Sequence, residues 1–372
     1  MNSVFDQRIG KVRKALLDQQ LDALMVSVQE NRFYLSGFTG EDTQFDESAG
    51  VLFVSGKHKI LATDSRYDLQ ARDQAQGFDI FCYQKGLEKA LPDLVKTLGI
   101  RRLGFESTRL SHKQYSQYAR VLGKLTPSVE MVPTEEIVEA LRRIKSEDEI
   151  QRTLSALQLA EKAFFEVLGR IRPGLTEKEV AWDMEKTMRE AGAQSLSFPV
   201  IVASGPNSAL PHAVPTDRKL EIGEPVLIDW GARLNEYCSD TTRTLILGKP
   251  DDRFSTVFEV VVSARDRATS AIQEGESGST IDKIARDMID EKGFAGKFGH
   301  GLGHGTGLAV HEGPRLSPVK DDRLSAGMIV TVEPGIYLPG WGGIRMENQV
   351  VVRSEGPQVL NNPEPFDPIL QV

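Results

Sequence analysis

The chain has 372 residues, and its 45 Lys and Arg against 53 Asp and Glu give a formal net charge of −8. A hydrophobic fraction of 40% and a charged fraction of 26% exclude general disorder and predict two or three folded domains. The acidic balance argues against a nucleic-acid binder, and no apolar run is long enough for a transmembrane helix. The two cysteines, Cys82 and Cys238, cannot build a disulfide framework. We therefore expect a cytoplasmic protein without a nucleic-acid or membrane partner.

The first 139 residues alternate between helix-like and strand-like patterns, which predicts an α/β domain with a parallel or mixed sheet. Ser55-Gly56-Lys57 lies between two strand-like runs and indicates a hairpin. No Gly-rich phosphate-binding motif follows a strand, so we expect no nucleotide site in this domain. The expected helices are 12–18, 69–76, 87–98 and 113–122, and the expected strands are 23–28, 51–54, 59–63, 78–83 and 102–105.

The pattern changes near residue 140, where we place the boundary between domain 1–139 and an α+β domain over 140–372. Ser146 with Glu149, and Thr176 with Glu179, have the spacing of capping boxes and predict the starts of two helices. The expected helices of this domain are 147–169, 177–192, 254–274 and 280–292, and its expected strands are 198–203, 225–229, 242–247, 328–332 and 350–353.

Two pairs of acidic residues flank turns between apolar strands. Asp229 and Asp240 are equidistant from position 234.5, so in a two-residue hairpin centred there they would be directly opposite each other. Glu333 and Glu347 are likewise equidistant from Gly340, which lies in a Gly-rich connection. We therefore expect two opposed acidic pairs, each at the end of a core strand.

Three interpretations of these acids are open. Most Asp and Glu side chains are simply solvated beside turns. Paired carboxylates also serve as the acid and base of glycosidases. Opposed acids in apolar surroundings need shared protons or a cation, and a metal site explains four acids together with nearby histidines better.

A Gly-rich segment, 298–312, carries half of the six histidines. His300 and His304 have the spacing of a helical zinc motif, but five glycines make a helix improbable and no Glu follows His300. The glycines instead indicate backbone packed closely against a ligand or another strand. Neutral imidazoles such as His304 and His311 are good metal ligands. His212 lies in a Pro-flanked loop, where substrate-contacting groups are common.

With these residues in place, the chain resembles the pita-bread metallopeptidases over nearly its whole length, specifically the Xaa-Pro dipeptidase (prolidase) and aminopeptidase P group. The resemblance implies a creatinase/prolidase-type α/β domain over 1–139 and an α+β pita-bread catalytic domain over 140–372. The strings that carry it are Asn31-Arg-Phe-Tyr-Leu-Ser-Gly37, Thr63-Asp-Ser-Arg-Tyr67, Asp240-Thr-Thr-Arg-Thr244, Glu333-Pro-Gly-Ile-Tyr337 and Gly343-Ile-Arg-Met-Glu347.

The resemblance also implies a site for two divalent metal ions. This oxygen-rich set suits Mn²⁺ first, with Co²⁺, Zn²⁺ and Fe²⁺ as alternatives. The implied ligands are Asp229, Asp240, His304, Glu333 and Glu347.

Further roles are implied for residues around the metal ions. Glu333 would move a proton, and His212 and His311 would contact substrate and stabilise the transition state. Arg345 would orient ligand carboxylates and contact substrate. Arg315 would bind a substrate carboxylate through two hydrogen bonds, although an ordinary surface arginine is the alternative.

The implied activity is hydrolysis of the bond between an N-terminal residue and proline in short peptides, by a homodimer of the dipeptidase or aminopeptidase P type. One alternative is that the same metal site acts on a small non-peptide amide or C–N bond. Another is a non-catalytic binding protein of this fold, which the five ligand-competent positions argue against. Two departures from the family pattern are Asn348, where Asp is usual, and the pair Asn235-Glu236, where Gly is common. The first is expected to tune metal affinity through hydrogen bonds to the ligands.

Overall fold

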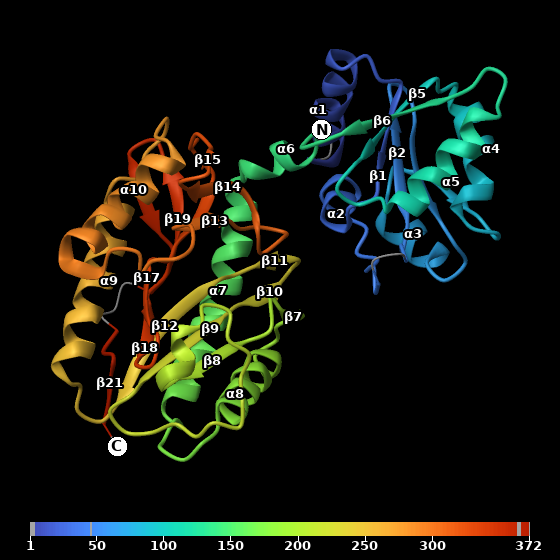
Figure 1. Cartoon of the computed structure of the whole chain (residues 1–372). Coiled ribbons are helices and arrows are strands. Elements are labelled where there is room, and N and C mark those ends of the chain that lie inside the picture. Colours follow the sequence, from blue (N-terminus) through green and yellow to red (C-terminus); the bar gives the residue numbers. More distant parts are fainter. Residues whose placement is uncertain (1–3, 45–46, 363–365, 372) are drawn as a thin grey trace. The chain divides into compact units, whose positions relative to one another are not determined.

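The computed structural model describes residues 4–44, 47–362 and 366–371 (Figure 1). The chain divides into two compact units, Met1–Arg142 and Arg143–Val372. The expected boundary after residue 139 lies three residues before this division. None of the described helices combines the length and the apolar composition needed to cross a membrane.

Unit 1 contains a mixed six-stranded sheet in the order β4-β3-β2-β1-β5-β6. Strands β1, β5 and β6 are parallel, β3 and β4 are parallel, and β2 is antiparallel to both of its neighbours. The expected hairpin forms between β2 and β3, with Val54 opposite Lys59. The strands are β1 (Ala23–Val26), β2 (Val51–Ser55), β3 (Lys59–Thr63), β4 (Asp79–Cys82), β5 (Arg102–Glu106) and β6 (Glu130–Thr134).

All four helices that we expect in this unit form. The unit also contains α2 and β6, which the sequence pattern did not predict. The first is α2, whose fully buried Asn31 and Arg32 lie beside the buried Tyr34 and Leu35, so its inward face mixes polar and apolar residues. The second is the edge strand β6, which contains Pro133. The helices are α1 (Val4–Asp18), α2 (Gln29–Ser36), α3 (Asp68–Gln74), α4 (Leu87–Leu98), α5 (His112–Gly123) and α6 (Glu139–Arg143).

The described residues of unit 2 include four long helices, and both expected capping boxes form. The side chains of Ser146 and Thr176 accept from the backbone of Glu149 and Glu179, whose side chains accept in return. These local interactions start the helices where the sequence predicts. The helices are α7 (Glu147–Leu168), α8 (Glu177–Glu190), α9 (Asp252–Ser270) and α10 (Gly278–Ile289), with short helical turns η1 (Gly205–Ala209) and η2 (Asp290–Phe294).

In the part of unit 2 that the structure describes, the strands form four sheets, in the orders β21-β12-β9-β8, β15-β14-β13-β16-β19-β20, β11-β10-β7 and β17-β18. The strands are β7 (Ser195–Leu196), β8 (Ile201–Ser204), β9 (Pro225–Trp230), β10 (Ala232–Leu234), β11 (Tyr237–Cys238), β12 (Thr241–Leu247), β13 (Gly303–Gly305), β14 (Glu312–Ser317), β15 (Lys320–Asp321), β16 (Ile329–Val332), β17 (Gly335–Leu338), β18 (Gly342–Arg345), β19 (Asn348–Arg353), β20 (Gly356–Val359) and β21 (Ile369–Leu370).

Each of the two larger sheets is covered by a pair of helices. Helices α7 and α8 share a core with β8, β9 and β12, in which Trp230 stacks on Phe164 with ring centroids 4.3 Å apart. The Trp230 indole N–H donates to the Ala160 carbonyl at 2.9 Å. Helices α9 and α10, orange in Figure 1, share a second core with β16 and β19. This packing holds the two sheets as rigid supports for the acidic residues at their strand ends.

Candidate active site

A cavity of about 430 Å³ in unit 2 gathers residues from both of its larger sheets. Eight of the nine predicted site residues line it: His212, Asp229, Asp240, His304, His311, Arg315, Glu333 and Arg345. The ninth, Glu347, is 1% exposed and belongs to the same acidic cluster as Asp229 and Asp240.

The first acidic pair reaches the site in a register that differs from the expected one. Asp229 on β9 lies opposite Thr242 on β12, so the expectation that Asp229 and Asp240 are directly opposed is wrong. The chain turns one residue later than expected, at Asn235-Glu236, whose φ angles of 50° and 71° place both in the left-handed region. A two-residue hairpin turn of this kind needs positive φ at both positions, and neither residue is glycine. The position of the turn sets the pairing of β9 with β12, and without a glycine at Asn235 or Glu236 the sequence did not mark that position.

The second acidic pair has the expected register. Val332 on β16 lies opposite Asn348 on β19, which places Glu333 and Glu347 at the next matched positions. The paired strands β17 and β18 continue the same register around Gly340. The prediction that this connection is centred on Gly340 is confirmed.

Part of the Gly-rich segment forms the short strand β13, in agreement with the expectation that the segment is not helical. A Cβ atom on Gly303 would lie 2.0 Å from the Thr331 carbonyl oxygen, and one on Gly305 would lie 2.1 Å from the Gly313 carbonyl oxygen. Only glycine permits this close approach of neighbouring backbones. Between the two glycines, the backbone N–H of His304 donates to the Thr331 hydroxyl at 3.0 Å.

All five predicted metal ligands come together. One carboxylate oxygen each of Asp229, Asp240 and Glu347 lie within 4.8 Å of one another. The His304 Nε2 lies 3.5 Å from Asp240 and 3.3 Å from Glu333. Its Nδ1 lies 3.1 Å from the backbone carbonyl oxygen of the next residue, which can only accept, so in the neutral imidazole the Nε2 lone pair faces the acids.

This cluster fits divalent cations. Asp229 Oδ1 and Glu347 Oε1 are buried and have no hydrogen-bond partner among the described residues. Buried polar atoms are almost always paired, and unpaired carboxylate oxygens that face other acids are suited to a cation.

The electrostatics of the acids point the same way. Burial raises the pKa of Asp240 well above its usual range, and repulsion from the Glu347 carboxylate adds to this. Burial also raises the pKa of Glu347, which Glu333 and Asp229 repel, and that of Asp229. Burial alone would raise the pKa of Glu333, but the hydrogen bond and charge that His304 supplies when its Nε2 carries a proton lower it to about 2. The chain alone therefore cannot keep all four acids ionised, and cations would do so.

A chain of hydrogen bonds supports the acids from one side. Arg345 donates from Nη2 to Asp229 Oδ2 at 2.7 Å and from Nη1 to the Tyr337 hydroxyl at 2.9 Å. The Tyr337 hydroxyl donates to His300 Nε2 at 2.8 Å, because His300 Nδ1 donates to the Gly301 carbonyl at 2.8 Å. Burial lowers the pKa of His300 and raises that of Tyr337. These hydrogen bonds therefore hold Arg345 against Asp229 through the neutral side chains of Tyr337 and His300.

Sequence reasoning did not assign a role to His300 or Tyr337. Both carried a signal: His300 is in the Gly-rich segment, and Tyr337 closes the string that begins at Glu333. It also missed the apolar residues of the cavity wall, which no spacing distinguishes from ordinary core residues. These are Phe198, Pro199, Ile201 and Pro211.

Besides Arg345, the three other residues expected to contact substrate, His212, His311 and Arg315, line the same cavity. The rings of His311 and His304 have centroids 4.3 Å apart. Arg315 lies on β14, opposite His304 on β13, and its backbone N–H donates to Asp322 at 2.8 Å. His212 is exposed in the loop that follows η1. The structure thus places two histidines and one arginine around the acids.

Asn348 contacts the backbone support of the cluster rather than the acids themselves. Arg243 donates to the Asn348 side-chain oxygen at 3.4 Å and to the Glu347 carbonyl oxygen. Burial lowers the pKa of Arg243 to about 10. The usual Asp would add a negative charge beside this buried cation, whereas Asn348 offers only a neutral amide.

Comparison with known proteins identifies both parts of the chain. Residues 151–354 match metallopeptidase family M24, and residues 8–144 match the creatinase/prolidase N-terminal domain. An uncharacterized peptidase, YqhT, of Bacillus subtilis (strain 168) is 39% identical over 95% of this chain and 98% of its own length.

Two solved structures share the fold over almost the whole chain. A structure described as an Xaa-Pro dipeptidase from Bacillus anthracis is 39% identical, with a TM-score of 0.92 over 98% of this chain and 100% of its own. A structure described as an X-Pro aminopeptidase from Thermotoga maritima MSB8 is 36% identical, with a TM-score of 0.85 over 95% of this chain and 98% of its own. These matches confirm the predicted fold class, an α/β creatinase-type domain followed by an α+β pita-bread domain. The chain therefore belongs to metallopeptidase family M24, and it is an enzyme of the prolidase and aminopeptidase P group.

Proposed function

We propose that the chain is a dinuclear-metal hydrolase that cleaves the bond between an N-terminal residue and proline, with dipeptides as its preferred substrates. The observation that carries this proposal is the convergence of four acids and His304 on one cavity, with two buried carboxylate oxygens that lack a partner among the described residues. Solved relatives described as an Xaa-Pro dipeptidase and an X-Pro aminopeptidase support the substrate class.

The metal ligands proposed are Asp229, Asp240, His304, Glu333 and Glu347, with Mn²⁺ as the preferred ion on the oxygen-rich ligand set. Two bound divalent ions would neutralise the acids, polarise a carbonyl group and lower the pKa of a water molecule. A homodimer and a cytoplasmic location remain predictions.

The chain's own residues would position the substrate and move a proton. Glu333 Oε1 accepts from the Thr331 hydroxyl at 3.1 Å, which holds the carboxylate where it can take and return a proton. His212 and His311 would donate hydrogen bonds to the peptide at the reacting carbonyl. Arg345, held by Asp229 and Tyr337, would keep the ligand carboxylate oriented.

The preference for dipeptides rests on Arg315. Arg315 lines the same cavity as the acids and lies opposite His304 in the β13–β14 pair. A proline at the second position of a dipeptide carries a free carboxylate, which an arginine binds through two parallel hydrogen bonds. A longer peptide has no carboxylate at that position.

The test is cleavage of a panel of Xaa-Pro dipeptides, Xaa-Pro-Yaa tripeptides and non-proline amides, with Mn²⁺, Co²⁺ and Zn²⁺ supplied separately. We expect metal-dependent cleavage confined to Xaa-Pro bonds. Asp240→Ala and His304→Ala should lose bound metal and more than about 100-fold in kcat/KM, since loss of even an outer hydrogen bond to a ligand costs 10- to 100-fold.

Asp217→Ala is a suitable control, because this acid is 85% exposed and lies outside the cavity. Full metal content and cleavage in Asp240→Ala would refute the proposed site. Cleavage of non-proline amides alone would change the substrate class, and a wild-type chain that binds no divalent metal would favour a non-catalytic binding protein.

A further inference from the structure

A second cavity, of about 260 Å³, lies entirely within unit 1. Three of the residues that line it directly follow strands: Ser27 follows β1, Asp64 follows β3 and Tyr83 follows β4. Strands β1, β3, β4, β5 and β6 all run in one direction, since β2 alone is antiparallel to its neighbours. The cavity therefore lies at the carboxyl edge of the sheet.

This edge contains the point at which the strand order reverses. From β1 the chain builds β2, β3 and β4 outward on one side, and then crosses to build β5 and β6 on the other side. In open α/β sheets, ligands bind outside the carboxyl ends of the strands at such a reversal. Ser27 after β1 and Arg109 in the segment after β5 both line the cavity, so it is at this point.

The charged groups of the cavity are balanced. Its lining includes the acids Glu47 and Asp64 and the bases Arg66 and Arg109. Arg66 lies 2.9 Å from Asp64 and 3.8 Å from Glu47. Two acids would repel a polyanion such as a nucleotide, whereas an equal number of acids and bases suits a zwitterion. Each arginine has five donors, so Arg66 can pair with Asp64 and still bind a ligand carboxylate.

Two tyrosines supply further donors inside the cavity. No hydrogen bond joins the hydroxyl of Tyr83 or of Tyr118 to any other residue that the structure describes. Burial raises the pKa of Tyr83 to about 12 and also raises that of Tyr118, so both hydroxyls keep their protons. Tyr83 is half-buried, and neither hydroxyl oxygen is among the fully enclosed polar atoms without a partner, so a ligand can reach both. The rest of the lining combines four apolar side chains with Ser27, Ser48, Gly86 and Gln114, and the apolar ones are Met25, Val51, Leu87 and Leu110.

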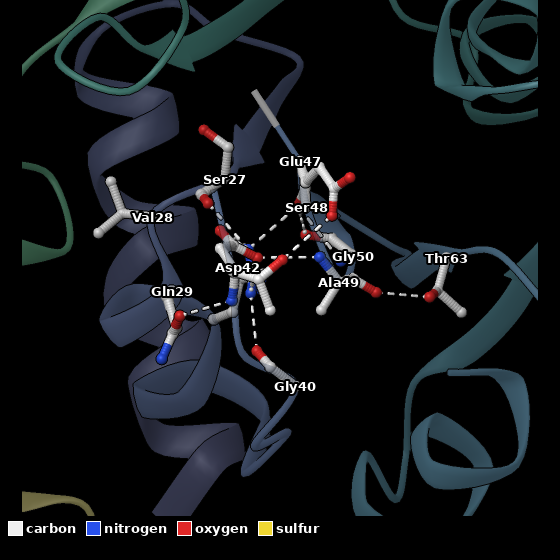
Figure 2. Close-up of polar contacts among 12 residues, drawn as sticks. Ser27, Val28, Gln29, Gly40, Asp42, Glu47, Ser48, Ala49, Gly50 and Thr63 are labelled. Carbon is white, nitrogen blue, oxygen red and sulfur yellow. Dashed lines mark hydrogen bonds and ion pairs between the residues drawn. The ribbon is translucent and has the colours of Figure 1, made fainter. Parts of the chain in front are cut away.

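The wall that carries Glu47 and Ser48 is held by a buried ion pair. Arg32 donates to both carboxylate oxygens of Asp42, at 2.7 and 2.9 Å, and to the Ser48 hydroxyl at 3.2 Å. Figure 2 shows Asp42 beside Ser48 and Ala49. The backbone N–H of Ala49 donates to Asp42 at 2.9 Å. The wall is thus anchored to the interior of unit 1, as the wall of a preformed ligand site is.

We propose that this cavity binds a free α-amino acid with an apolar side chain. Arg66 and Arg109, with the tyrosine hydroxyls, would bind its carboxylate, and Glu47 and Asp64 its ammonium group. The apolar residues Met25, Val51, Leu87 and Leu110 would hold its side chain, and the volume suits a molecule smaller than the drug-sized ligands that fill about 300 Å³ or more. This inference is independent of the function proposed for unit 2.

The test is calorimetric titration of the full, Mn²⁺-loaded chain with L-leucine, N-acetyl-L-leucine and L-leucinamide. We expect L-leucine to bind, and the two derivatives, which lack the ammonium or the carboxylate charge, to bind at least 10-fold more weakly. Arg66→Met should weaken L-leucine binding at least 10-fold. Arg72→Met is the matched control, since Arg72 is 55% exposed against 56% for Arg66 and also pairs with a nearby acid, but lies outside the cavity.

The Asp240→Asn variant distinguishes binding in this cavity from binding at the acidic site of unit 2, because the substitution changes only the acidic site. Retained L-leucine binding in Asp240→Asn, together with loss in Arg66→Met, supports the proposal. No L-leucine binding to the wild-type chain, equal binding in Arg66→Met, or loss of binding in Asp240→Asn would each overturn it. Failure here leaves the Xaa-Pro cleavage assay unaffected, so the two proposals fail separately.

Discussion

Arg315 is the residue on which substrate length should depend. We expect Arg315→Met to raise KM for Xaa-Pro dipeptides by about 10- to 100-fold, since hydrogen bonds to a charged group contribute about 1.5–3 kcal/mol. The kcat for dipeptides and the KM for Xaa-Pro-Yaa tripeptides should change little. Steady-state kinetics on both substrate classes measures this, with Arg253→Met on the exposed part of α9 as the control. An equal loss on dipeptides and tripeptides would argue against a carboxylate contact.

Glu106 should make the stability of the chain depend on pH. Its carboxylate accepts from the backbone N–H groups of Ser27 and Val28 and from the Asn31 side chain, each at 2.6 Å. Burial nevertheless raises its pKa from 4.5 to about 7. The folded state then binds the proton more tightly than the unfolded state, so this contribution is complete below pH 4.5 and is lost as pH rises to 7. The loss amounts to about 3 kcal/mol, at 1.36 kcal/mol per pKa unit.

Urea unfolding between pH 4.5 and 7.5 measures this effect. We expect the free energy of unfolding of Glu106→Gln to fall less with rising pH than that of the wild type, because an amide does not ionise. Glu130→Gln, an exposed substitution on β6, should keep the wild-type slope. Parallel pH profiles for Glu106→Gln and the wild type would show that the carboxyl is already ionised at low pH.

The strand β13 presents His304 to the acids because its glycines allow neighbouring strands to approach. Gly303→Ala would place a Cβ atom 2.0 Å from the Thr331 carbonyl oxygen, so β13 must move away from β16. We expect a loss of about 3 kcal/mol in the free energy of unfolding and weaker metal binding, because overpacking costs about 1–3 kcal/mol and the clash here is with backbone. Denaturation and metal analysis measure both quantities.

Gly299→Ala is the matched control in the same segment, since a Cβ atom there meets nothing within 4 Å. It should retain the stability and the metal content of the wild type. If Gly303→Ala matched it in both respects, the close approach of β13 would not be what positions His304.

Elements defined by local chemistry were predictable, and those defined by burial were not. Ser146 and Thr176 start helices through bonds to residues three positions ahead, so spacing alone revealed them. The burial of two polar residues of α2 became visible only with their partners: Asn31 binds Glu106, and Arg32 binds Asp42. A polar residue in sequence does not disclose whether a distant residue will pair with it.

Metal binding should stabilise the chain as a whole. A ligand that binds only the folded state adds about 2.7 kcal/mol at 100 times its Kd. We expect Mn²⁺ to raise the Tm of the wild-type chain relative to the chelated chain. It should leave the Tm of Asp240→Ala unchanged, because that variant lacks one of the three acids of the central cluster. Calorimetric scans of both chains test this, and an equal Mn²⁺ effect on both would mean that the stabilising ion binds elsewhere.

By itself, the sequence determined which residue types gather at the acidic site, the register around Gly340 and the resemblance to a known family. These depend on residue identity and short spacings, which need no knowledge of distant contacts. Only the tertiary structure decided how Asp229 and Asp240 meet, because two left-handed residues at the turn shifted their register. It also decided that Arg345, Tyr337 and His300 form one chain of hydrogen bonds and that unit 1 encloses a charge-balanced cavity. Such features arise where segments far apart in sequence pack together, and packing is a property of all partners at once.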